Sequence, residues 1–151
     1  MDAETAQFLA FIEESLDMIL SCVDGQSTEQ LRWTPAASRT NCLQVIAAHS
    51  LANAERNVLA TFCGEPYVYN REAEFIAKDL SAAELLTRWN DLRSRMRSRL
   101  EKSDASWLTR ECNHVRLGAV PGRTVLLQAA RHGAEHVGEA RLTRDLLEAR
   151  R

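Results

Sequence analysis

Four long stretches of this 151-residue chain carry apolar side chains at every third or fourth position, the period of a helix that buries one face. All three prolines fall between these stretches, where a helix has to end. The pattern predicts an all-α fold, a four-helix bundle forming one domain over residues 1–151. The predicted helices run from about Thr5 to Val23, Cys42 to Cys63, Ser81 to Lys102 and Thr124 to Arg150.

Capping signals mark several helix ends. Ser27 to Gln30 reads as a capping box that opens a single helical turn, and Ser81 with Glu84 three residues later reads as a second one. Asn41 is the expected N-cap of the second long helix, and Gly64 is its expected stop. On the inner faces of the first and fourth helices, the periodicity places Phe11 and Leu146 among the buried residues.

Two longer segments separate the helices. Residues 64–80 form a connection long enough to carry the chain along the bundle, so the second and third helices need not be an antiparallel pair. Residues 103–121 lack a helical period and have room for a short hairpin. We interpret His114, in this second segment, as a loop histidine.

Composition limits the classes of partner. The net charge of −2 does not favour nucleic acid or an anionic membrane, and we interpret the arginines of the third helix as a solvated face or as partners of the acidic first helix. No apolar run approaches membrane-spanning length, and the first residues do not resemble a signal peptide. We therefore expect a cytoplasmic protein with free thiols at Cys22, Cys42, Cys63 and Cys112, which include no CxxC pair.

Three histidines are the strongest functional signal. His132 and His136 are four residues apart in the fourth helix, so their imidazoles lie on one face. His49 lies near the apolar stripe of the second helix and can supply a third ligand. Three protein ligands with an open position are typical of a catalytic metal site. The alternative is that all three are hydrogen-bonded core residues, because short motifs of this kind also arise by chance.

The order of these motifs resembles a known family. Leu31-Arg32-Trp33-Thr34-Pro35, followed by Asn41-Cys42-Leu43 and then His49, resembles the entry to the second helix of the DinB/YfiT-like superfamily. The run from His132 to Glu139 resembles its fourth-helix signature. The resemblance extends over essentially the whole chain. Cys42 stands where many relatives have Ser, and Glu139 stands where Gln is common.

The resemblance implies a four-helix bundle, often a homodimer, that binds a divalent metal such as zinc or nickel through His49, His132 and His136. Characterised relatives include thiol S-transferases that use mycothiol or bacillithiol, and a mycothiol-dependent maleylpyruvate isomerase. The expected activity is thus a metal-dependent thiol transfer or a related reaction on a small molecule. Transfer, hydrolysis and isomerisation all remain open.

Four polar residues near the three histidines are further candidates. Glu135 and Glu139 are candidate catalytic groups, as a base or as groups that orient an imidazole. Asn53 and Arg56 are candidate contacts of a cofactor or substrate. Two alternatives to an enzyme stay open: a bundle that binds metal or a partner without catalysis, and a dimerisation module with no metal.

Overall fold

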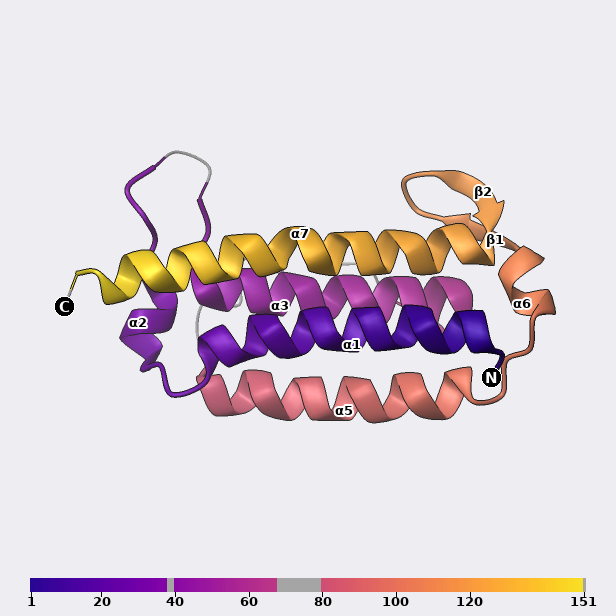
Figure 1. The fold of residues 1–151 in the computed structure, drawn as a ribbon, viewed down its shortest axis with the longest axis horizontal. Coiled ribbons are helices and arrows are strands. Elements are labelled where there is room, and N and C mark those ends of the chain that lie inside the picture. The colour runs from indigo at the N-terminus through magenta and orange to yellow at the C-terminus, as the bar shows by residue number, and fades with distance from the viewer. Residues whose placement is uncertain (38–39, 68–79, 151) are drawn as a thin grey trace.

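The computed structural model describes residues 1–37, 40–67 and 80–150, and it confirms the predicted four-helix bundle (Figure 1). The long helices are α1 (Ala3–Val23), α3 (Leu43–Ala54), α5 (Ala82–Leu100) and α7 (Gly122–Glu148), and α3 continues directly into the π-helix η1 (Glu55–Phe62). No helix in these ranges is long and apolar enough to cross a membrane.

The helices pack as two parallel pairs of opposite direction. Arg123 binds Glu4 at the start of both α7 and α1, so these two helices run side by side in the same direction (Figure 1). Arg95 of α5 binds Glu55 at the end of α3, so α3 and α5 also run in one direction. Most of the connection that the sequence predicts between these two helices, residues 64–80, lies outside the described residues.

Short elements close the two ends of the bundle. The single turn α2 (Thr28–Arg32) lies at one end, while α6 (Ser106–Thr109), β1 (Glu111–His114) and β2 (Gly118–Pro121) lie at the other (Figure 1). The two strands form an antiparallel hairpin in which Cys112 pairs with Val120, which confirms the expected hairpin. The turn between them uses Gly118 at a φ of 72°, a conformation that favours glycine.

The starts of the helices test the capping residues that the sequence predicts. Both capping boxes form, at Ser27 and at Ser81. The expected cap at Asn41 is wrong: Cys42 occupies the cap position of α3 without a side-chain hydrogen bond. The Asn41 amide instead donates to Glu139 of α7, because a tertiary partner lies within its reach.

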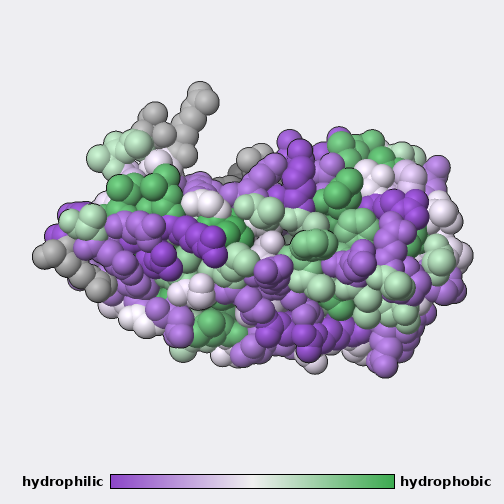
Figure 2. All heavy atoms as spheres, viewed as in Figure 1, coloured by the Kyte–Doolittle hydropathy of each residue, from purple (hydrophilic) through white to green (hydrophobic). Residues whose placement is uncertain are grey.

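The bundle buries one face of each long helix. Phe11 and Leu146 are exceptions to the prediction, being 61% and 43% exposed, because each lies at the edge of its helix's apolar stripe and faces outward. Hydrophobic side chains on the face formed by α1 and α7 occur in separate groups among hydrophilic ones (Figure 2). The largest fully buried side chains are Phe62, Ile12, Leu16, Ile19, Leu20, Leu31, Leu43, Ile46, Leu59, Leu85, Met96 and Leu100.

Two backbone features set where α3 and α7 present their side chains. In η1 the backbone N–H of Cys63 donates to the carbonyl of Val58, five residues back, at 3.0 Å. π-helical turns are rare in proteins, and those that occur are often found at functional sites. In α7, a Cβ placed on Gly133 would lie 2.9 Å from the Cβ of Ser15, so α1 and α7 approach closely beside the histidine pair.

Candidate metal centre

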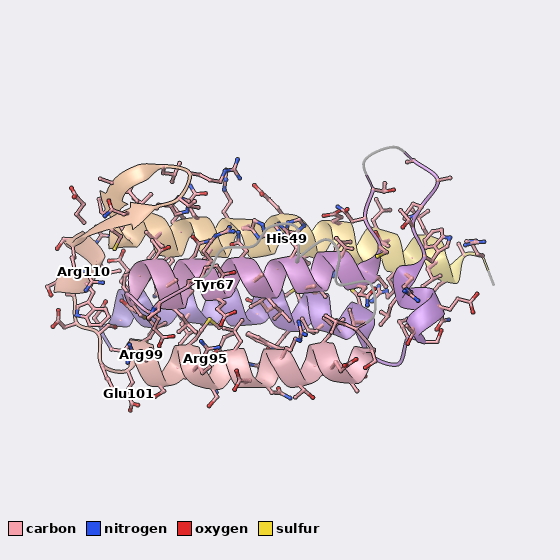
Figure 3. All side chains as sticks on the ribbon, turned by 180° about the vertical axis from the view of Figure 1, so that it is seen from behind. His49, Tyr67, Arg95, Arg99, Glu101 and Arg110 are labelled. Atoms are coloured by element: carbon pink, nitrogen blue, oxygen red, sulfur yellow. The ribbon has the colours of Figure 1, made fainter. Side chains whose placement is uncertain are left out.

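The three predicted histidines meet at the contact between α3 and α7. One potential ligand atom from each of His49, His132 and His136 lies within 4.8 Å of the other two. The Nε2 atoms of His132 and His49 are 3.0 Å apart, and the ring centroids of His132 and His136 are 4.4 Å apart. The ring planes are inclined to one another by 59–89°, so no two of the three rings stack face to face. Figure 3 shows His49 where α3 meets α7.

Glu139 fixes the orientation of the His136 ring. Its Oε2 atom lies 2.6 Å from Nδ1 of His136, and its Oε1 atom accepts a 3.1 Å hydrogen bond from the Asn41 amide. An imidazole that donates from Nδ1 to a carboxylate keeps the lone pair on Nε2 free for a metal. The chain Asn41–Glu139–His136 is thus the arrangement that usually supports a metal-binding histidine.

The environment keeps these groups in the states that bind metal. Burial, together with the neighbouring His136 and His49, lowers the pKa of His132 to about 3, so its imidazole is neutral near pH 7. The hydrogen bond with His136 lowers the pKa of Glu139 below its usual value, so this carboxylate is ionised. A neutral imidazole and an ionised carboxylate are the forms that metal coordination requires.

The donor set fits a divalent metal. Two nitrogens bound to one tetrahedral zinc ion at 2.0–2.1 Å are about 3.3 Å apart, close to the 3.0 Å that separates the His49 and His132 Nε2 atoms. Three imidazole ligands leave a fourth position for a small molecule, and they suit zinc, nickel, copper or iron. Without a metal, bringing three ring nitrogens this close offers little, since neutral imidazoles carry one donor each.

The other predicted site residues surround this cluster in different ways. Asn53 and Arg56 are buried on the same side of α3 and η1, and Asn53 accepts a 2.8 Å hydrogen bond from Asn57. The Arg56 guanidinium is close enough to lower the pKa of both His132 and His114. Glu135 points to solvent, 57% exposed, and faces Arg131 at 3.6 Å.

His114 has a structural role that its sequence position did not show. It ends strand β1, is buried, and accepts hydrogen bonds at Nδ1 from the backbone N–H groups of Arg116 and Leu117. The prediction of a loop histidine is therefore wrong, because pairing with β2 places this residue in the ladder. Burial lowers the pKa of His114, in keeping with a ring that only accepts at Nδ1.

Asn41 is the contributor to the site that sequence reasoning missed. It was interpreted as a helix cap, whereas its amide contacts Glu139, 98 residues away in the chain. Spacing alone could not reveal this contact, since nothing local relates the start of α3 to the middle of α7. The signal was the unusual carboxylate at Glu139, which needs a donor once it is half-buried.

Comparison with known proteins agrees with the fold. The family model described as mycothiol-S-transferase matches residues 7–149, nearly the whole chain. A conserved protein of Enterococcus faecalis has a crystal structure that superimposes with a TM-score of 0.74 over 99% of both chains, at 15% sequence identity. This likeness concerns the fold alone. No curated protein matches the sequence.

Proposed function

We propose that this chain, which belongs to the mycothiol-S-transferase family within the DinB/YfiT-like superfamily, is a metal-dependent thiol S-transferase acting on a small electrophile. The observation that carries the proposal is the convergence of His49, His132 and His136 on one point. The proposed metal is zinc or nickel, and the proposed cosubstrate is a low-molecular-weight thiol, mycothiol or bacillithiol.

The chemistry follows from the open position that three imidazole ligands leave on a metal. The three histidines would hold a divalent metal, which would lower the pKa of a bound thiol and so favour the nucleophilic thiolate. The reaction forms a bond between the thiol sulfur and an electrophilic carbon of the substrate, and the displaced group leaves with its bonding electrons. The thiol proton has to be accepted by a base, for which Glu135 at the solvent edge of α7 is our candidate.

The surrounding residues take positioning roles in this proposal. Glu139, held by Asn41, keeps His136 in the tautomer that offers Nε2. Arg56 supplies a buried positive charge near His132, which favours an anionic group of the substrate or the developing charge on a leaving group. Asn53, one turn from His49, offers an amide for hydrogen bonding to the same ligand.

The decisive experiment measures metal and activity together. Untagged wild-type protein and His132→Ala are analysed by elemental mass spectrometry after loading with zinc or nickel, and both are assayed for conjugation of mycothiol and bacillithiol to a chromogenic electrophile. We expect about one metal per chain and thiol transfer in the wild type, and loss of both in the variant. A wild-type protein that retains no metal after loading would refute the proposal, and a metal-loaded protein inactive with either thiol would reduce it to non-catalytic metal binding.

We also propose a homodimer. Phe11 on α1 and Leu142 and Leu146 on α7 are exposed large apolar side chains on helices that lie side by side, and a second copy can cover them. Sedimentation equilibrium of the wild type and of the triple variant Phe11→Ser, Leu142→Ser, Leu146→Ser tests this surface. A dimeric wild type and a monomeric, folded variant are expected, whereas a monomeric wild type would exclude the dimer.

A further inference from the structure

One buried charge lies near the histidine cluster. In the part of the chain that the structure describes, Arg56 is the only Asp, Glu, Lys or Arg residue that is buried, at 8% exposed. It belongs to η1 and follows His49 by seven residues, which is about two helical turns. Moving a guanidinium out of water costs free energy unless acceptor groups meet it inside the protein. A cation kept at this position therefore favours the binding of an anion.

The π-helix η1 sets the position of this arginine. The Thr61 hydroxyl donates to the Arg56 carbonyl at 2.9 Å, and this bond joins residues five apart, as the backbone bonds of a π-helix do. Asn57, the next residue, is also buried, and its amide donates to Asn53 at 2.8 Å. The backbone at the end of α3 thus places a cation and a pair of amides in the interior of the bundle.

His114 brings a second donor to the same region. Its Nδ1 atom accepts from the backbone N–H groups of Arg116 and Leu117 at 3.1 and 3.2 Å, so Nδ1 carries no proton. Burial, together with the charge of Arg56, lowers the pKa of His114, so the ring is neutral near pH 7 and holds its proton on Nε2. Strand β1, which ends at His114, packs against η1 at the end of the bundle where α7 begins (Figure 1).

The two groups select a chemical class of ligand. A guanidinium has five N–H donors and no acceptor, so it can bind several acceptors at once, and it cannot accept from the imidazole N–H. The pair carries one positive charge, because His114 is neutral. A carboxylate has two acceptor oxygens in the plane that suits a guanidinium, and its single negative charge balances that of Arg56. A phosphate dianion would leave an excess charge in the interior.

We propose that Arg56 and His114 form a carboxylate-binding subsite, and that the electrophile used by this protein carries a carboxylate group. The inference rests on the proposed function, which supplies the reacting end of that molecule. The backbone of Arg56 lies at most about 10 Å along the helix from that of His49, so one small molecule can reach both the subsite and the histidine cluster. The carboxylate does not react, and its binding energy orients the electrophilic carbon.

The test uses a carboxylate that has no reacting atom and a protein that holds no metal. The probes are para-fluorobenzoate and its neutral counterpart para-fluorobenzamide, titrated into metal-free protein and followed by fluorine NMR. We expect the wild type to bind the benzoate, and to bind the benzamide roughly tenfold more weakly or worse. Arg56→Met should weaken benzoate binding by a similar factor. Arg56→Lys, which keeps the charge but not the planar fork, should weaken it less.

Two variants of the hairpin complete the series. His114→Asn keeps an acceptor for the two backbone N–H groups but removes the Nε2 donor, so benzoate binding should weaken about threefold. Arg116→Met removes an exposed arginine from the same hairpin, and this matched control should bind the benzoate as the wild type does.

Each outcome supports or overturns the subsite. A wild type that does not bind the benzoate, or that binds the benzamide equally well, would overturn it, as would unchanged binding in Arg56→Met or an equal loss in Arg116→Met. Circular dichroism checks that each variant is folded, and Arg56→Lys with His114→Asn carry the test if Arg56→Met does not fold. Because the measurement needs neither metal nor thiol, benzoate binding that depends on Arg56 stands even if metal binding or thiol transfer fails.

Discussion

Two of the antiparallel contacts in the bundle, α1 with α5 and α3 with α7, use polar residues in opposite ways. Between α1 and α5, charges are complementary: Arg97 binds Glu13 through two N–H groups at 2.7 and 2.6 Å, and Asp17 accepts from both Trp89 and Arg93. Between α3 and α7, three imidazoles of the same kind converge. The first contact joins opposite charges within the chain, whereas the second brings together three groups of one kind whose nitrogens suit a divalent metal.

The largest expected difference between the two contacts is their response to metal. Zinc at about a thousand times its dissociation constant should raise the free energy of unfolding of the wild type by about 4 kcal/mol, because it binds only the folded chain. His132→Ala should lose this gain, and Arg97→Ala should keep it. Chemical denaturation with and without zinc measures both. An equal response of the two variants would remove the distinction between the contacts.

The next largest difference between the two contacts should be the effect of acid on the stability of the protein. His132 has its pKa lowered to about 3 from 6.5, so between these values the unfolded chain binds a proton that the native protein does not. The stability of the metal-free protein therefore falls as the pH falls through this window, by up to about 1.4 kcal/mol per pH unit from this group. His132→Ala should give a flatter profile in urea denaturation from pH 7 to 4. An unchanged slope would show that His132 is not held neutral.

Removing the carboxylate behind the site should weaken metal binding without abolishing it. Glu139→Ala deletes the group that orients His136 and should lower the zinc affinity by roughly 10 to 100-fold. The variant Glu139→Gln keeps an acceptor for His136, so its zinc affinity should lie between those of the wild type and Glu139→Ala. Competition with a chelating dye measures the affinities. Glu135→Ala, which alters an exposed carboxylate on the same helix, is the control and should bind zinc as the wild type does.

Two glycines of α7 allow a matched test of the contact between α7 and α1, which form one of the parallel pairs. At Gly133 an added Cβ meets Ser15 of α1 at 2.9 Å, whereas at Gly138 it meets nothing within 4 Å. Gly138→Ala should stabilise the protein by roughly 0.5–1 kcal/mol through helix propensity. Gly133→Ala should destabilise it by about 1 kcal/mol because crowding outweighs the same gain. Equal thermal shifts in the two variants would contradict the close approach.

The smallest effect should come from the exposed ion pair. Arg97→Ala removes a guanidinium that is largely in water, where side-chain entropy and hydration offset most of the attraction to Glu13. We expect Tm to change by at most a few degrees at low salt and the difference to vanish at 1 M NaCl. A large, salt-independent loss would mean that this contact, rather than the core, holds α5 in place.

Most of the fold could be predicted from the sequence because the residues that determine it lie close together in the chain. The helical period and the two capping boxes at Ser27 and Ser81 lie within a few residues of the elements they define. The π-helix was not predicted, since α-helical and π-helical turns have similar apolar patterns over eight residues. The exposure of the Phe11 side chain was also not predicted, because periodicity locates the apolar stripe of a helix but not the edge of that stripe.

The site residues also fall into two groups: those that local spacing predicts and those that depend on tertiary packing. The pair His132 and His136 follows from spacing on one helix, and the addition of His49 needed only the expectation that α3 faces α7. The role of Asn41 and the solvent exposure of Glu135 depend on how the two helices are rotated against each other. The rotation of α7 within the bundle depends on tertiary packing, including that of Gly133 against Ser15 of α1, which no local pattern records.

The parallel pairing of α1 with α7 has a consequence for biosynthesis. Helix α1 is synthesised before α7 and has to wait for it before its apolar face is fully covered, since Glu4 and Arg123 are 119 residues apart in the chain. Such distant contacts close late in folding. Helix α7 also delivers two of the three imidazoles, so completion of the core and assembly of the histidine cluster depend on the same late folding step.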